Sequence, residues 1–552
     1  MSASKFHSYD KGGPFGDPDG SREDFQRFIS FDAGKAWGGL AIQRGDLTVR
    51  VVVGGKGSGK TMYKRLLEDG ASANSDVYVF RHAHHLPPTN LIERFSTAAT
   101  PPEGSENVDP TSVVSYSQMF DDNLRTGHWQ ILWRRAIFRS LASLFYASSL
   151  CPKELTPHTT NPTNFFNRFS RLVPRHFETP ESIFNQVSDI ISRYGSPRKA
   201  IDYLNDPLWE SFEATILRDL HLNRPVCYFI DAIDEDFRHA PSAWIDCQKG
   251  LFYTVMGLLR DTEIDSGLHI CICIRDIVYS SVLQSSEHSS RYYNVAPIRL
   301  LEWSRESASV FLKEKLKSLP PAYMMEPNAR DKAKAWLGFH TIRNVRRKID
   351  ENVLDYILRH TRFLPRDIVN MGNALCLKVI EAKTRQRTLT EEEVRNTVAT
   401  VAELIGNETL RICGNHLAVS SLPRFGLKKL YEKTPDQPIE SDWATEIITQ
   451  MLWDIGKDIF TEEELHQALE KYQDEFAVGA EKTKYRQYRI ETILWQHGLL
   501  GYKERIRSEK SVFYSSAFTN FFLPPGKPRY VLHSSLIDAI KIRSVGKMPV
   551  AA

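Results

Sequence analysis

Short apolar runs alternate with amphipathic stretches over the N-terminal half of the chain. Runs at 47–53, 76–80, 224–235, 268–275 and 295–301 are rich in β-branched and apolar residues, as buried strands are. Between them, apolar residues at helical spacing predict helices at 62–69, 129–149, 243–259 and 306–316. Strands that alternate with helices in this way predict a parallel α/β sheet covered by helices on both faces.

Beyond Pro320 the pattern becomes helical. Helices are predicted at 349–359 and 365–383, and a third begins at a capping box formed by Thr390 and Glu393. We expect this all-α region to form a lid on the α/β core.

The pattern changes again from Asp442. One helix ends near 458, a second starts at the capping box 461–464, and a third is predicted at 483–497. Two short strands, 498–502 and 511–514, follow and are joined by a charged turn. Three helices and a hairpin in this order predict a winged-helix domain.

The first apolar strand runs into the sequence G-x-x-x-x-G-K-T. Glycines let the backbone fold around an anion, the Lys60 ammonium reaches the β- and γ-phosphates of a nucleotide, and the Thr61 hydroxyl binds Mg²⁺. A chance match in a Gly-rich loop is the alternative, but a strand before the motif and a helix after it favour a phosphate-binding loop. The predicted nucleotide-binding residues are Gly54, Gly55, Lys56, Gly57, Ser58, Gly59, Lys60, Thr61 and Met62.

The strand that begins near Arg224 ends in carboxylates. Asp231 is the predicted Mg²⁺ residue, and Asp234 or Glu235 would orient or deprotonate the attacking water. An apolar strand that ends in aspartate is common, so this strand indicates a Mg²⁺ site only in combination with the phosphate loop. We expect Lys60 and Asp231 to lie at neighbouring strand ends of one sheet.

The 552 residues provide room for several domains. We predict a flexible Gly/Pro-rich lead-in at 1–24 and a nucleotide-binding core at 25–318 with a helical insertion at about 150–205. A helical lid at 319–435 and the winged-helix domain at 436–552 complete the predicted organisation.

Composition adds constraints on compartment and ligands. The 71 Lys and Arg against 68 Asp and Glu give almost no net charge, so a nucleic-acid footprint would have to be local. Seven scattered cysteines without a C-x-x-C pair indicate reduced thiols, and no apolar run has the length of a membrane span, so we expect a cytoplasmic protein. His82, His84 and His85 resemble a metal motif, but they run into Pro87 and are interpreted as a loop.

Taken together, these motifs resemble the STAND branch of AAA+-type ATPases, particularly the bacterial ATPases related to the origin-recognition type. The acidic motif D-x-x-D-E of this branch is matched by residues 231–235. The resemblance implies a sensor-1-like role for Arg275 and a sensor-2-like role for Arg366, with a surface or ion-paired arginine as the alternative. This chain departs from ordinary AAA+ proteins, where sensor 1 is usually Asn or Thr and sensor 2 has the form G-x-x-R.

The resemblance implies an ATP-hydrolysing, Mg²⁺-dependent switch that assembles as a homo-oligomer. Related proteins often act in bacterial conflict systems, including antiphage defence, and with no recognisable effector domain here a separate effector or partner protein is expected. An arginine from a neighbouring subunit would complete the site. The candidates are Arg291, Arg299 and the cluster 343–348.

Three alternatives differ in class. A DNA-binding loader or initiator would use basic residues of the winged helix, namely Lys484, Arg486, Arg489 and Arg507. Acidic neighbours dilute this charge, and the alternative is a solvated charged face on a domain that serves only protein contacts. A small-molecule kinase is disfavoured by the long helical tail, and a GTPase by the lack of an N-K-x-D motif after the acidic strand.

Overall fold

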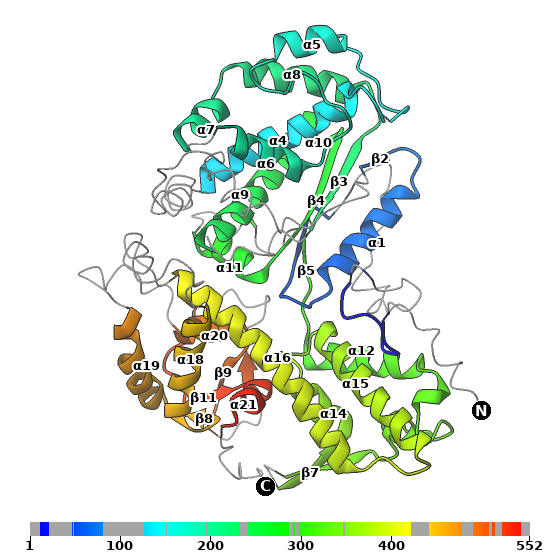
Figure 1. The fold of residues 1–552 in the computed structure, drawn as a ribbon, viewed down its shortest axis with the longest axis vertical. Coiled ribbons are helices and arrows are strands. Elements are labelled where there is room, and N and C mark those ends of the chain that lie inside the picture. Colours follow the sequence, from blue (N-terminus) through cyan, green and yellow to red (C-terminus); the bar gives the residue numbers. More distant parts are fainter. Residues whose placement is uncertain are drawn as a thin grey trace, which may run out of the picture.

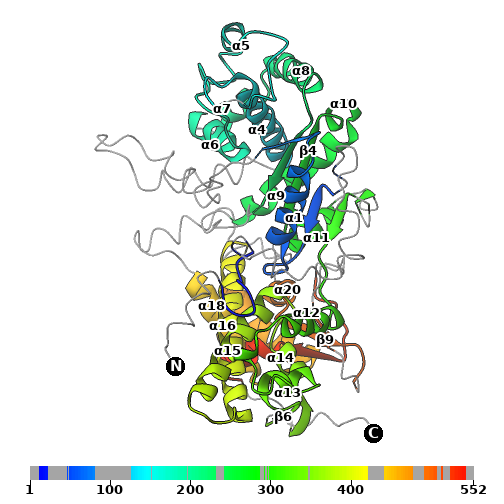
Figure 2. The same cartoon turned by 90° about the vertical axis from the view of Figure 1, so that its right-hand side faces the viewer.

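The structure is a computed structural model of the 552-residue chain. It describes residues 12–20, 22, 47, 49–80, 126–150, 152–194, 197–231, 241–285, 291–292, 295, 297–345, 348–420, 441–476, 490–506, 511–513 and 522–542. The α/β sheet with its helices lies at one end of the long axis, and the lid and C-terminal regions lie at the other (Figures 1 and 2).

A five-stranded parallel sheet forms the core, as the sequence predicts. Its strands are β1 (Val51–Val53), β2 (Tyr78–Val79), β3 (Val226–Ile230), β4 (Leu268–Ile274) and β5 (Ile298–Leu300). They lie in the order β2-β3-β4-β1-β5, and every pairing is parallel. The phosphate-loop strand β1 and the acidic strand β3 are therefore not neighbours, which corrects our expectation, because β4 lies between them.

Alternate residues of each strand pack into different cores, as a two-sided sheet requires. Val51 and Val53 belong to the larger core with helices α4 (Thr126–Tyr146) and α9 (Pro241–Arg260), whereas Val52 faces helix α1 (Lys60–Ser72). The same alternation holds in β4, where the isoleucines face α4 and α9 while Cys271 and Cys273 face α1. Figure 1 shows α1 on one face and the larger helical layer on the other.

Three of the helices in the core region lie in the predicted insertion. Helices α5 (Pro162–Arg168), α6 (Ile183–Tyr194) and α7 (Pro197–Leu204) lie within 150–205, where we predicted a helical insertion. Their apolar side chains join the larger core, so the insertion packs on the sheet's helical layer. The other helices here are α8 (Leu208–His221), α10 (Thr262–Asp265) and α11 (Asp276–Ser285).

The lid is mostly helical but contains a hairpin that the sequence did not predict. Strands β6 (Thr341–Asn344) and β7 (Ile349–Asn352) pair antiparallel, so the predicted helix at 349–359 begins only at Val353. Asn352 caps that helix by accepting hydrogen bonds from the N–H groups of Leu354 and Asp355. The lid elements are α12 (Arg305–Lys317), η4 (Pro321–Tyr323), α13 (Lys332–Leu337), α14 (Val353–Arg359), α15 (Pro365–Thr384) and α16 (Glu391–Ser420).

Helix α12 connects the α/β core to the lid, and helix α16 connects the lid to the C-terminal region. The predicted boundary at 318 places α12 in the nucleotide-binding core, but its buried residues pack in the lid core with α14 and α15. Helix α16 begins at the predicted capping box, since Thr390 and Glu393 exchange backbone-to-side-chain hydrogen bonds of 3.1 and 3.2 Å. Its second half supplies Leu410, Cys413 and Leu417 to the C-terminal core.

The C-terminal region contains the predicted hairpin within a larger sheet. Strands β9 (Leu500–Lys503) and β10 (Ser511–Phe513) pair antiparallel, and β11 (Arg529–Leu532) and β8 (Ile459–Phe460) extend them in the order β10-β9-β11-β8. The helices are α18 (Ser441–Ile455), α19 (Glu462–Phe476), α20 (Ile490–Gln496) and α21 (Ser534–Ile540). The winged-helix assignment stays a prediction.

Residues 12–20 are packed, whereas we expected a flexible lead-in. Phe15 is 1% exposed and belongs to the lid core. One aromatic anchor therefore fixes a Gly/Pro-rich stretch whose composition alone indicates a loop. Within the described part of the chain, no helix is both long and apolar enough to span a bilayer.

Candidate functional site

The phosphate loop joins β1 to α1 at the carboxyl end of the sheet. The Gly54 N–H donates to the Ile274 carbonyl of β4 at 3.2 Å, and the Ser58 N–H donates to the Gly55 carbonyl at 3.2 Å. Gly57 and Gly59 have φ values of +88° and +96°, in the left-handed region that favours glycine. The predicted glycines thus bend the loop at the start of α1, where backbone N–H groups can bind an anion.

Lys60 lies against this loop. Its ammonium donates to the carbonyl oxygens of Gly54 and Gly55, at 2.9 and 3.0 Å. These contacts hold the side chain along the inner surface of the loop. From there the charge is available to a phosphate group that enters the cradle.

Asp231 ends β3 at the same edge of the sheet, one strand beyond β4. The buried Cys273 lies between the two charges: burial raises the pKa of its thiol, Asp231 raises it further, and Lys60 lowers it. Lys60 and Asp231 thus lie at the same carboxyl edge of the sheet, and β4 separates their strands. Thr61 and Asp231 are the residues that could hold Mg²⁺, and no larger cluster of metal-ligating side chains occurs among the described residues.

Arg275 and Asp276 follow β4 directly and lie beside the loop. Asp276 is a buried carboxylate that we did not predict, and a Cβ on Gly55 would lie 3.3 Å from its Oδ2 atom. Burial raises the pKa of Asp276, while the charges of Lys60 and Arg275 lower it. Its position just after Arg275 at a strand end was the signal that could have found it.

The lid reaches the loop through Arg366 and Trp303. The Arg366 backbone N–H donates to the Gly57 carbonyl at 3.3 Å, and a Cβ on Gly57 would lie 3.0 Å from the Arg366 Cβ. The Trp303 indole N–H donates to the Ser58 carbonyl at 2.9 Å. The predicted sensor-2-like arginine therefore begins its helix against the phosphate loop.

Helix α16 adds an ion pair from the other side. Lys56 of the loop lies 2.9 Å from Glu408. Burial raises the pKa of the Glu408 carboxyl, but the contact with Lys56 and the charge of Arg366 outweigh it, so the pKa is lowered. Further along α16, His416 makes a 3.3 Å hydrogen bond with His497; burial lowers the pKa of both histidines, and the charge of Arg275 lowers it further. Residues from the C-terminal half of the chain, namely Arg366 and Glu408, thus contact the phosphate loop.

Several predicted residues lie outside the described part of the chain. These are Asp234, Glu235, the histidines at 82–85 and the basic residues Lys484, Arg486, Arg489 and Arg507. Of the predicted trans-acting arginines, Arg299 lies on β5, and Arg343 on β6 pairs with Asp350 at 3.2 Å. Lys503, expected in the charged turn, is a buried β9 residue.

Burial lowers the pKa of His416, His497 and His533, so we expect the C-terminal region to lose stability in acid. His533 caps α21 by accepting from the Ser535 N–H at 3.2 Å, and burial lowers its pKa to about 4. Because its folded pKa lies below the ordinary value of about 6.5, stability is fully present above pH 6.5 and is lost as pH falls toward 4. We expect His533→Asn, which keeps a capping side chain, to reduce the fall in melting temperature between pH 7.5 and 5.

Between pH 7.5 and 5 this effect on the free energy of unfolding has an upper bound of about 2 kcal/mol, because roughly 1.4 kcal/mol is lost per pH unit over the ~1.5 units below pH 6.5. The exposed His176 provides the matched control, because His176→Asn should leave the pH dependence as in the wild type. Thermal unfolding followed by circular dichroism measures both. Equal pH dependence in the His533 variant and the wild type would contradict the assignment.

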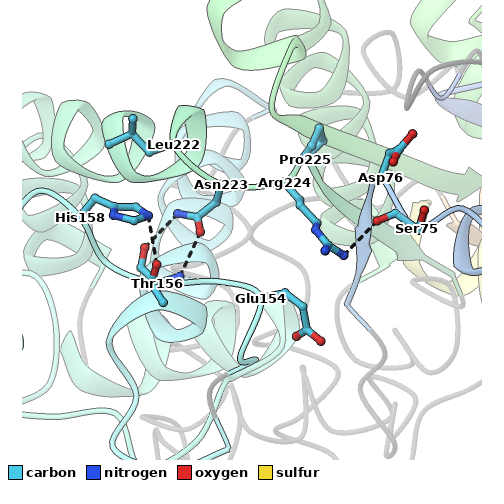
Figure 3. Close-up of a pocket in the computed structure, with 9 residues that line it drawn as sticks. All are labelled: Ser75, Asp76, Glu154, Thr156, His158, Leu222, Asn223, Arg224 and Pro225. Carbon is cyan, nitrogen blue, oxygen red and sulfur yellow. Dashed lines mark hydrogen bonds between the residues drawn. The ribbon is translucent and has the colours of Figure 1, made fainter.

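A cavity of about 590 Å³ lies away from the phosphate loop. It is formed before β2 and β3, at the amino end of the sheet, by turns that include Asp76, Thr156 and Arg224 (Figure 3). Its polar groups bind one another: Arg224 donates to the Ser75 carbonyl at 2.9 Å, and the Asn223 side chain holds both the N–H and the carbonyl of Thr156. These hydrogen bonds connect the turns that line the cavity, so its polar groups are used in holding the fold. The phosphate loop therefore remains the candidate site.

Comparisons with known proteins give little further guidance. No protein-family model matches the chain, and no curated protein matches it. Among solved structures, the Walker-type ATPase PABY2304 of Pyrococcus abyssi aligns over 92% of this chain and 95% of its own, with 10% identity and a TM-score of 0.34. A score this low assigns neither fold nor function, so any functional assignment depends on the parallel sheet and its phosphate loop.

Proposed function

We propose that this chain is a Mg²⁺-dependent ATPase that works as a switch. The observation that carries the proposal is the Lys60 ammonium lying inside a glycine loop at the start of α1, on the sheet edge that also presents Asp231. The loop N–H groups and Lys60 would hold the β- and γ-phosphates. Thr61 and Asp231 would hold Mg²⁺, which neutralises charge on the transferred phosphoryl group.

The phosphate loop contacts the rest of the chain, which would allow it to act as a switch. Arg366, Trp303 and Glu408 each contact the loop from the C-terminal half. A triphosphate that enters the cradle would change the charge that these groups face, so nucleotide state would be coupled to the arrangement of the lid. The arginines at 275 and 366 would neutralise the transition state, as the resemblance to STAND ATPases implies.

The biological setting proposed from that resemblance is a bacterial conflict system, such as antiphage defence. The protein would act as a homo-oligomer with a separately encoded effector or partner. A DNA-binding loader or initiator is the second candidate, and the β9–β10 hairpin next to α20 is the observation that favours it. Nucleic acid would then contact the basic residues predicted for the winged helix, Lys484, Arg486, Arg489 and Arg507.

A binding and turnover assay tests the proposal. We expect saturable binding of a fluorescent ATP analogue, displaced by ATP about tenfold better than by GTP because no guanine-reading N-K-x-D motif is present. Hydrolysis is then measured alone and with single- or double-stranded DNA. Stimulation by DNA would favour the loader, unchanged turnover would favour the protein-triggered switch, and no binding of ATP would contradict both.

A further inference from the structure

The segment 12–20, here called the strap, is anchored in the lid. The Phe15 N–H donates to the Asn373 Oδ1 atom at 2.8 Å, and the Asn373 side chain returns a hydrogen bond to the Gly16 carbonyl at 3.0 Å. The Phe15 ring lies 5.2 Å from Trp336, centroid to centroid, in the lid core. A Cβ on Gly372 would lie 2.3 Å from this ring, so α15 provides room for Phe15 at that turn.

The other end of the strap lies on α1. The Gly20 carbonyl accepts a 2.6 Å hydrogen bond from Arg65, and a Cβ on Gly20 would lie 3.3 Å from the Met62 backbone nitrogen. The strap therefore runs from the lid core to the first turns of the helix that follows the phosphate loop. Figure 1 shows it in dark blue between α1 and the lid helices α12 and α15.

Between these two ends the strap holds Arg366. The Pro18 carbonyl accepts a 3.2 Å hydrogen bond from the Arg366 Nε atom, while the Arg366 backbone N–H binds the Gly57 carbonyl. A two-point ion pair between Arg362 and Asp367, at 3.0 and 3.2 Å, brackets the same turn. The backbone of Arg366 is thus set by the loop and its side chain by the strap.

We propose that the strap positions Arg366 for ATP turnover, with Phe15 and Asn373 as positioning residues. The inference rests on the proposed function. The Pro18 contact engages the Nε–H of the guanidinium, and the two terminal NH₂ groups would then donate to a phosphate. Donors aimed in advance at developing charge lower the barrier, and a small displacement costs much of that gain. If Phe15 served only to pack the lid core, its loss would destabilise that core and would have no effect specific to Arg366.

The decisive variant is Phe15→Ala, which removes the anchor and leaves the loop, Lys60 and Arg366 in the sequence. We expect kcat to fall by about 10- to 100-fold, with nucleotide affinity within about threefold of the wild type, because the strap acts on the transition-state donor and not on the cradle. Phe15→Met keeps most of the side-chain volume and its apolar character, and should restore most of kcat. Leu389→Ala opens a cavity in the same core on another segment and is the matched control.

A second measurement needs no activity. The Arg366 amide is protected by its bond to Gly57, so Phe15→Ala should speed its hydrogen exchange by about tenfold, more than Leu389→Ala does. Equal effects of the two variants on kcat and on this amide would overturn the strap proposal while leaving the ATPase intact. If wild-type protein binds no nucleotide, the proposed function fails, and the exchange data alone decide whether the strap positions Arg366.

Discussion

Lys60→Ala is expected to weaken ATP binding by roughly 10- to 150-fold, since a hydrogen bond to a charged group is worth about 1.5–3 kcal/mol. Hydrolysis should fall below detection, because the same ammonium also neutralises charge on the transferred phosphoryl group. In the wild type this ammonium is held by the Gly54 and Gly55 carbonyls, so it is placed before any phosphate arrives. Isothermal titration with ATP and Mg²⁺, followed by a phosphate-release assay, measures both effects.

Lys64→Ala is the matched control. Lys64 lies one turn further along α1 and pairs with Glu68 at 3.0 Å, so its loss removes the same charge from the same helix. Affinity and turnover should stay close to wild type in this variant. Equal losses in the two variants would mean that net charge on α1 matters and the loop geometry does not, and unchanged turnover in Lys60→Ala would refute the site.

Local pattern was enough to predict most elements of the fold. The β-branched runs give all five strands of the sheet, and the capping box at Thr390 marks the start of α16. Strand order could not be predicted, because pairing between distant segments is not encoded in the local period. Consequently Asp231 and Lys60 were expected on adjacent strands, whereas β4 lies between them. The polar run at 349–352 pairs as β7 although its spacing fitted a helix.

The candidate site shows the same division between local and distant information. The loop residues and Arg275 follow from motifs that fill a few consecutive positions. Asp276 was missed because its local signal, a position at a strand end after Arg275, is not a motif, and its significance arises from burial beside Gly55. Phe15 was missed because a single aromatic residue in a Gly/Pro-rich stretch has no period, and its anchor at Asn373 is 358 residues away.

Asp231→Asn is expected to lower the hydrolysis rate by about 100-fold or more while changing ATP affinity by less than about tenfold, because the carboxylate acts through Mg²⁺ on the transition state. Asparagine keeps the shape of the side chain and removes its charge. Asp231 follows the fully buried strand β3, so we expect the asparagine of the variant to keep the same position. The rate should also need more Mg²⁺ for half-saturation, which a titration of turnover against Mg²⁺ concentration measures.

Asp76→Asn makes the same change at the other edge of the sheet, where Asp76 precedes β2 and lines the cavity at the amino end of the strands. It removes one negative charge from the same domain, so long-range electrostatics alone would affect both variants similarly. Metal binding at the carboxyl edge predicts a shifted Mg²⁺ requirement in the Asp231 variant only. A wild-type Mg²⁺ titration in Asp231→Asn would assign the metal to other groups, and the pairing of Thr61 with Asp231 would have to be abandoned.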